Sequence, residues 1–441
     1  MDASKHDLPS KEGDLDEEQH SQSPRKKPRQ KLTQNDSVFH DFPVTMIKGL
    51  ADCLNHWILD KSSFSFKTLT ALKFLNCNAA DTRQGNTFSQ VFCSVKPYRQ
   101  LHPLGDLFTK GLLMLTDFMT SRQVPQNIEE KRVLGKLLNF LIKNTEAKQS
   151  SLKNLEKYNE SELAIVLANH LFGKLSTSDT FVINQQSKHR SKDGGQATCP
   201  CDVTTCELTG TFGDTSVGNC KVWHGNLGII INNDTMLESV TIGDQVNNPN
   251  DKDDTSTDDE DSSDDCSEQD PRVKLKECLS RNNKLLAESI VFSFLQKQKH
   301  PKKEHFLCPC IGVKAREMIV FCYDSQHDVL LESSAIPLLS ENLTTLGKIN
   351  TLAIVVAWLV VNYKYLCNGL TDDMKIAKSM FFSQAESKLN IYNDMLKLGE
   401  VGNAYFIEDD AMKFLSPNSS LALRQLNERV LKLRYSTKAE Y

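Results

Sequence analysis

A run of carboxylates between Asp251 and Asp270 limits what this chain can fold into more than any other feature. It contains eleven acidic residues, one lysine and no aromatic residue. Because such a segment cannot bury enough apolar surface to offset the entropy lost on ordering, we expect a disordered insert over residues 247–270. The core must therefore form from the segments on either side. The insert itself would bind a basic protein partner, shield a basic groove or remain a solvated insertion.

The apolar pattern outside the insert predicts a protein of the α+β or α/β class. We expect a small mixed sheet packed with N-terminal and C-terminal helices. The expected segments are a disordered basic and polar tail (1–38), a helical region (39–183), a flexible Cys- and Gly-rich connection (184–220), a strand–helix core that contains the insert (221–345) and C-terminal helices (346–441).

Apolar residues at helical spacing predict several helices. The leucines at positions 69, 72 and 75 indicate a short helix in the N-terminal region. Another helix begins with Asn159 or Ser161 as its cap, and we expect it to stop at Gly173. The apolar run Thr351–Val361 is about half the roughly 20 residues that a membrane span needs. We therefore expect it to be a buried core helix, and we expect no membrane partner.

Two groups of strands are predicted on either side of the insert. Ile229, Ile230 and Ile231 form a β-branched run, and a polar turn returns the chain into a second strand, so a hairpin is expected. After the insert, a helix that ends before Pro301 leads into three short strands over residues 305–333.

The charge and cysteine content exclude some classes of protein. The formal net charge is −5, so any nucleic-acid contact must come from a local basic patch. The 13 cysteines are scattered, and the first 40 residues contain no apolar segment of the kind that a signal peptide needs. We therefore expect an intracellular protein in a reducing compartment. The basic cluster from Pro24 to Lys31 favours the nucleus over the cytoplasm, unless it is an ordinary solvated tail.

A group of cysteines in the connection is a candidate zinc site. Cys199, Cys201, Cys206 and Cys220, with His224 close behind, would supply four tetrahedral ligands. Their spacing differs from that of paired C-x-x-C knuckles. The alternative is that they are unligated thiols in a flexible loop.

The order helix, strand, hairpin strand, helix, strand resembles the core of the PD-(D/E)XK (restriction-endonuclease-like) nuclease superfamily. The segments "VWHGNLGIIINN", "LESV", "LLAESIVFSFLQKQKHP" and "LCPCIGVKAREMIVFCYDSQHDVLLES" are similar to uncharacterised invertebrate proteins of that kind. The resemblance covers roughly residues 162–334. In that family an acid on one strand and the acid of an E-x-K motif on the next bind Mg²⁺, and the lysine orients the attacking water.

The resemblance implies an incomplete active site. Glu162 matches the acid of the preceding helix, and Glu238 matches the acid of the second strand. These two would be the Mg²⁺ ligands. Gly228 stands where the acid of the first strand is expected, and Val240 stands at the lysine position. Neither side chain can do the required chemistry, although Lys284, or Asp234 for the acid, would substitute if the residues have migrated.

The resemblance therefore favours a catalytically degenerate nuclease-like domain that binds nucleic acid or a protein. A second hypothesis is that the protein is an active Mg²⁺-dependent nuclease that uses Glu162, Glu238 and Lys284. A third is a protein-interaction scaffold that involves no nucleic acid. Binding to nucleic acid would need a basic groove, for which the candidates are Lys188, Arg190, Lys192, Lys314 and Arg316.

Overall fold

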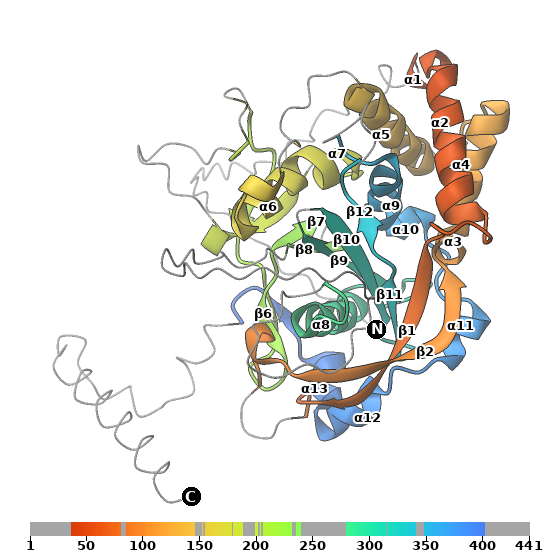
Figure 1. Ribbon diagram of the computed structural model, residues 1–441. Helices are drawn as coiled ribbons and strands as arrows, with labels where there is room; N and C mark the ends of the chain where they lie inside the picture. The colour runs from red at the N-terminus through yellow and green to blue at the C-terminus, as the bar shows by residue number, and fades with distance from the viewer. Residues whose placement is uncertain are drawn as a thin grey trace, which may run out of the picture.

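A large mixed sheet between two layers of helices organises the protein, which we describe from a computed structural model (Figure 1). The structure describes residues 37–80, 85–145, 152, 155–178, 180–187, 199–201, 203, 206–231, 235–239, 279–314, 316–340 and 348–401. The basic cluster, the acidic insert and the segment after residue 401 lie outside these residues. A mixed α and β class was predicted, and the structure confirms it.

The large sheet has ten strands among the described residues. Nine follow the order β2-β1-β11-β10-β9-β8-β7-β3-β4, and β12 pairs with β10. β8 runs parallel to β9, β3 runs parallel to β4, and the other pairs are antiparallel. The bounds are β1 Thr68–Cys77, β2 Cys93–Pro103, β3 Phe181–Asn184, β4 Thr211–Gly213, β7 Ile229–Ile231, β8 Thr235–Ser239, β9 Leu307–Lys314, β10 Glu317–Asp324, β11 Val329–Ser333 and β12 Ile336–Pro337.

Each face of the sheet has its own apolar core. Side chains alternate along a strand, so Ile229 and Ile231 join one core and Ile230 joins the other. The first core includes residues of α1 Ser37–Asp41, α2 Val44–Leu54, η2 Asn55–Leu59, α3 Leu104–Leu107, α4 Thr109–Ser121, α5 Ile128–Thr145, η5 Leu155–Lys157, α6 Glu160–Leu167, η6 Ala168–Phe172, α7 Gly173–Leu175, α9 Thr351–Val361, α10 Tyr363–Leu366 and α11 Asp372–Ile376.

The second core is covered by fewer helices and by a small sheet. Its elements are η3 Phe88–Gln90, α8 Asn283–Lys299, α12 Phe381–Ala385, α13 Leu389–Asp394 and the three-stranded sheet β13-β5-β6. The small sheet is formed by Lys397–Leu398, Ser216–Gly218 and His224–Asn226. Two short turns, η7 Gln185–Ser187 and η8 Glu386–Lys388, complete the described elements.

Each core contains one helix that is buried along most of its length. In α9 every residue from Leu352 to Val361 is buried, as the sequence predicted for this run. In the part of the chain that the structure describes, no helix is long and apolar enough to cross a membrane. α8 is buried from Leu285 to Gln296, is capped by the side chain of Asn282 and ends before Pro301. It connects β8 to the parallel strand β9.

The predicted short helix around Leu69 is wrong, because that segment forms the strand β1. Leu69 and Leu72 are buried, whereas Leu75 is 56% exposed. A bulge between Thr70 and Leu72 shifts the register against β2. Leu69 belongs to the first core and Leu72 to the second, because side chains alternate between the two faces of a sheet that is buried on both sides. Their interval of three therefore imitates a helical stripe. The sheet is therefore larger than the small sheet that was expected.

The predicted hairpin before the insert is confirmed, since Ile229 pairs with Leu237. The three strands after α8 are confirmed as β9, β10 and β11. The helix that begins at Asn159 does not stop at Gly173, because a π-helical turn carries it on into α7. The connection over 184–220, expected to be flexible, contains β4 and β5.

Candidate functional site

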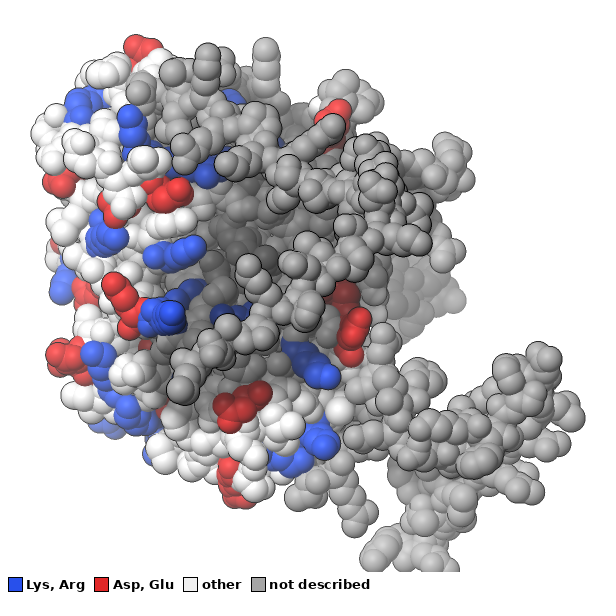
Figure 2. Space-filling model, turned by 180° about the vertical axis from the view of Figure 1, so that it is seen from behind, with Lys and Arg blue, Asp and Glu red and all other residues white. Residues whose placement is uncertain are grey.

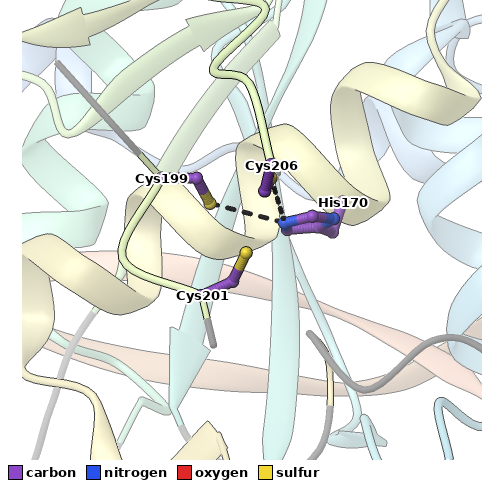
Figure 3. Close-up of side chains that lie close together, drawn as sticks. All are labelled: His170, Cys199, Cys201 and Cys206. Carbon is purple, nitrogen blue, oxygen red and sulfur yellow. Dashed lines mark hydrogen bonds between the residues drawn. The ribbon is translucent and has the colours of Figure 1, made fainter. Parts of the chain in front are cut away.

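Three thiols and one imidazole converge beside α6, on the side of the sheet that holds the first core. The ligand atoms of His170, Cys199, Cys201 and Cys206 all lie within 4.8 Å of one another. His170 Nε2 lies 3.4 Å from the sulfur of Cys199 and 3.4 Å from that of Cys206 (Figure 3). The cysteines are free thiols. The site therefore joins a helix to a loop that follows it by about thirty residues.

The helical side of this cluster is a π-helical turn. η6 spans Ala168–Phe172 and lies between α6 and α7, with buried apolar residues around it. It presents two polar side chains, Asn169 and His170, within an otherwise apolar stretch. Single π-turns are rare and occur frequently at functional sites. This turn therefore marks the cluster as a built feature of the fold.

Asn169 fixes the loop that carries the third cysteine. Its side-chain amide donates to the carbonyl of Glu207 at 3.1 Å and to the sulfur of Cys206 at 3.4 Å. Its amide oxygen accepts from the backbone nitrogen and the hydroxyl of Thr209, at 3.1 and 3.0 Å. Because Asn169 is 2% exposed, these bonds replace solvent at a buried polar group. They hold Cys206 against the neighbouring His170.

Burial shifts the pKa values of the cluster toward the neutral forms. The pKa of Cys206 is raised to about 12, first by burial and then by the adjacent thiols of Cys201 and Cys199. Burial also raises the pKa of Cys199. The pKa of His170 is lowered to about 4, mainly by burial and further by the charge of Lys174. At neutral pH the imidazole is therefore uncharged, with a lone pair available to a ligand.

Cys220 and His224, which were predicted to complete the zinc ligands, are not part of this cluster. His224 lies in β6 of the small sheet, and its Nδ1 is 2.9 Å from the carbonyl oxygen of Val222. That sheet packs against the second core, whereas Cys199 and Cys201 belong to the first. The large sheet thus separates the two groups, and His170 takes the fourth position.

Glu162, the predicted helix acid, acts as a helix cap. Its carboxylate accepts from the backbone nitrogen of Asn159 at 3.2 Å, and its own backbone nitrogen donates to the Asn159 side chain at 2.9 Å. This reciprocal pair is a capping box, which satisfies two backbone donors at the start of α6. Glu162 therefore has a structural role that requires no metal.

A neighbouring acid, Glu160, contacts the predicted lysine instead. Lys284 Nζ lies 3.7 Å from a carboxylate oxygen of Glu160 and 3.9 Å from one of Glu288. Glu160 is 49% exposed and Lys284 34%, whereas the Glu288 side chain is fully buried. A lysine in the first turn of α8 opposes the helix dipole, and the two carboxylates offset that cost. We call Glu160, Lys284 and Glu288 the acid–lysine group.

The backbone of β8 passes close to the acid–lysine group. Glu238 pairs in register with Gly312 of β9. A Cβ at Gly312 would lie 2.5 Å from a methyl group of Leu285, the residue after Lys284. The first turn of α8 thus packs on the sheet beside the position of Glu238, whose side chain is not among those described.

Of the other predicted positions, the structure describes Gly228, which has no side chain. Gly228 directly precedes β7, and its carbonyl accepts from the backbone nitrogen of Asn184 at 3.0 Å. Val240 and Asp234 lie outside the described residues, as do Lys188, Arg190 and Lys192.

Three residues of these sites were missed by reasoning from the sequence. His170 stands alone on an apolar helix, where a histidine usually belongs to the core, and its cysteine partners lie far along the chain. The sequence feature that could have revealed His170 is the polar pair Asn169–His170 inside the apolar run "ELAIVLANHLFGKL". Glu160 was passed over because Glu162, in the same helical turn, was matched to the acid of the preceding helix. Glu288 was missed because most of its neighbours in α8 are apolar.

Searches of family models, of curated proteins and of solved structures find no match to this chain. The resemblance to the nuclease superfamily is therefore a prediction from the sequence pattern.

Proposed function

We propose that the protein binds nucleic acid through a PD-(D/E)XK (restriction-endonuclease-like) core whose hydrolytic site is incomplete. The observation that carries this proposal is the order of elements around β8. The helix from α6 to α7 is followed by β3, by the short strands β4 to β6 and by the hairpin β7–β8, and α8 then leads to β9, which is parallel to β8. A hairpin followed by a helix and a further strand is the arrangement that the resemblance implies, and it supports the proposal.

The acid–lysine group supports the loss of hydrolysis. A nuclease of this type places Mg²⁺ among carboxylate oxygens, which hard cations prefer. Here the ammonium of Lys284 lies within 4 Å of both Glu160 and Glu288. It therefore offsets part of the negative charge that would attract a divalent cation. Gly228 offers no side chain where the acid of the first strand is expected.

Two basic residues lie at the end of β9 closest to this group. Lys314 ends β9, two residues after Gly312, and the exposed Arg316 follows in the turn to β10. Elsewhere, basic and acidic side chains are interspersed over the described part of the face in Figure 2. Nucleic acid would therefore be held by a local patch, as the net charge of −5 requires.

The experiment that tests this function measures binding and cleavage together. The full chain is incubated with labelled single- and double-stranded DNA and RNA in Mg²⁺, Mn²⁺ or EDTA, across a series of salt concentrations. We expect binding that weakens steeply with salt and no cleavage. The double substitution Lys314→Ala and Arg316→Ala should reduce the slope of log K against log salt by about 2, if each residue contacts one phosphate. Lys48→Ala, on the exposed side of α2, is the matched control.

The acid–lysine group also motivates one competing function, a Mg²⁺-dependent nuclease with migrated catalytic residues. It places two carboxylates and a lysine beside β8, which are the groups that hydrolysis of a phosphodiester needs. Metal-dependent cleavage that is abolished by Glu238→Ala, and retained in the partly exposed control Glu129→Ala, would establish this function in place of ours. Absence of any binding would instead favour a protein-interaction scaffold.

A further inference from the structure

We propose that His170, Cys199, Cys201 and Cys206 bind a structural Zn²⁺ ion that fastens the loop before β4 to the π-helical turn η6. This inference is independent of the proposed function, because it concerns a different part of the fold.

The spacing of the ligand atoms is that of a zinc tetrahedron. With zinc–sulfur bonds of about 2.3 Å and zinc–nitrogen bonds of about 2.0 Å, sulfur and nitrogen ligands lie about 3.5 Å apart. The two printed distances from His170 Nε2 to sulfur are both 3.4 Å, and no pair of ligand atoms exceeds 4.8 Å. Figure 3 shows the sulfurs of Cys199 and Cys201 and the imidazole of His170 turned toward a common centre, with Cys206 beside them. One ion at that centre would reach all four.

The ligand types select the metal and its role. Thiolates and imidazole are soft or borderline donors, which favour zinc over Mg²⁺ or Ca²⁺. Four protein ligands fill the tetrahedral shell and leave no position for water, so the site would be structural and not catalytic. The Asn169 amide that donates to the sulfur of Cys206 is the type of outer contact that orients metal ligands.

A bound metal ion would explain why these thiols lie so close together. Without a cation, the sulfurs of Cys199 and Cys206 lie 3.4 Å from the same imidazole nitrogen and make only weak hydrogen bonds there. A zinc ion would release the thiol protons to solvent and replace these contacts with coordinate bonds.

The bound ion would position an edge of the large sheet. Gly210 packs so closely on the ring of Phe181 that a Cβ there would lie 2.1 Å from a ring carbon. The next residue, Thr211, begins β4 and pairs with Val182 of β3. The loop that carries Cys206 therefore leads straight into the edge strand. A metal on Cys206 would hold that strand in register.

The first experiment is elemental analysis of the full chain, expressed with zinc and dialysed against metal-free buffer. We expect one zinc per chain. Exchange with Co²⁺ should give the visible bands of a tetrahedral site together with sulfur-to-cobalt charge-transfer absorption. Neither measurement needs a variant, so a substitution that prevents folding does not weaken the test. A chain that folds, retains no zinc and gives no tetrahedral cobalt spectrum overturns the proposal.

Variants then identify the ligands. His170→Ala and Cys201→Ala should lose the metal, and His170→Cys should restore it as a four-thiolate site. Cys220→Ala, the matched control, should keep it. If Cys220→Ala loses zinc while His170→Ala retains it, the ligand set read from the sequence is correct and ours is wrong.

Discussion

His170, Cys199, Cys201 and Cys206 form what we call the thiol–imidazole cluster. This cluster and the acid–lysine group both bring ionisable side chains from α6 or the adjoining π-turn into contact with a distant segment. The two groups balance charge differently. In the first, the side chains are neutral, and their lone pairs converge on a common centre. In the second, the cation is part of the chain, since Lys284 lies within 4 Å of Glu160 and Glu288. The first group is thus suited to bind a metal ion, whereas the second has its own cation. The spacing of the side chains alone would not distinguish the two groups. The presence of a lysine cation in the second group does.

The largest expected effect is the loss of stability when zinc is removed. At a free zinc concentration about 1,000 times the Kd, binding to the folded state stabilises it by about 4 kcal/mol. A chelator should therefore lower the Tm of the native protein. His170→Ala, which has already lost the metal, should show no further change. An equal fall in both proteins would mean that the chelator acts elsewhere.

Replacing Lys284 should have a smaller effect. Lys284→Met removes a cation next to the fully buried carboxylate of Glu288, which should lower the free energy of unfolding by about 1–3 kcal/mol. Glu160→Gln, at a side chain that is half exposed, should cost less than about 1 kcal/mol. Urea denaturation would measure the change in the free energy of unfolding for both variants. The double variant Lys284→Met/Glu288→Met should recover much of the loss, because it removes the buried charge as well.

The Lys284→Met variant also tests whether the lysine replaces a metal. Millimolar Mn²⁺ should raise its Tm and leave that of the native protein unchanged. A Tm that responds equally to Mn²⁺ in both proteins would contradict this account.

The smallest effect concerns Asp328, a buried carboxyl held by hydroxyl groups. It accepts from the hydroxyl of Tyr323 at 2.9 Å and also from Ser379. Burial raises its pKa, and these hydrogen bonds only partly oppose the shift. The folded state therefore binds the proton more tightly than the unfolded state. Its contribution to stability should be greatest below the unfolded pKa of about 4 and should fall as the pH rises through the folded value.

Urea denaturation across this pH range should reveal the fall in the native protein and its absence in Asp328→Asn. Asp372 is the matched control. Its pKa is lowered by Lys375, so its contribution is lost as the pH falls, and Asp372→Asn should change the profile in the opposite direction. A profile unchanged by Asp328→Asn would contradict the raised pKa.

Local patterns in the sequence predicted the elements that are stabilised locally. The β-branched run at Ile229 gave the hairpin, and the cap at Asn159 gave the start of α6. The strand β1 was missed because its two faces pack in different cores, so Leu69 and Leu72 lie three residues apart as in a helical stripe. Three of the four residues of the thiol–imidazole cluster could be predicted from the sequence because they share one short loop. His170 was not, because only the tertiary fold brings it there.

The pairing of β1 with β11 has a consequence for synthesis of the protein. Leu69 pairs with Ser333, so the partner of this early strand is made long after the strand itself. At roughly 5 to 20 residues per second, the delay on the ribosome is on the order of tens of seconds. During that time the apolar residues of β1 have no completed sheet to join, and an unpaired strand edge invites aggregation. Synthesis is therefore a stage at which β1 is exposed to aggregation before the sheet forms.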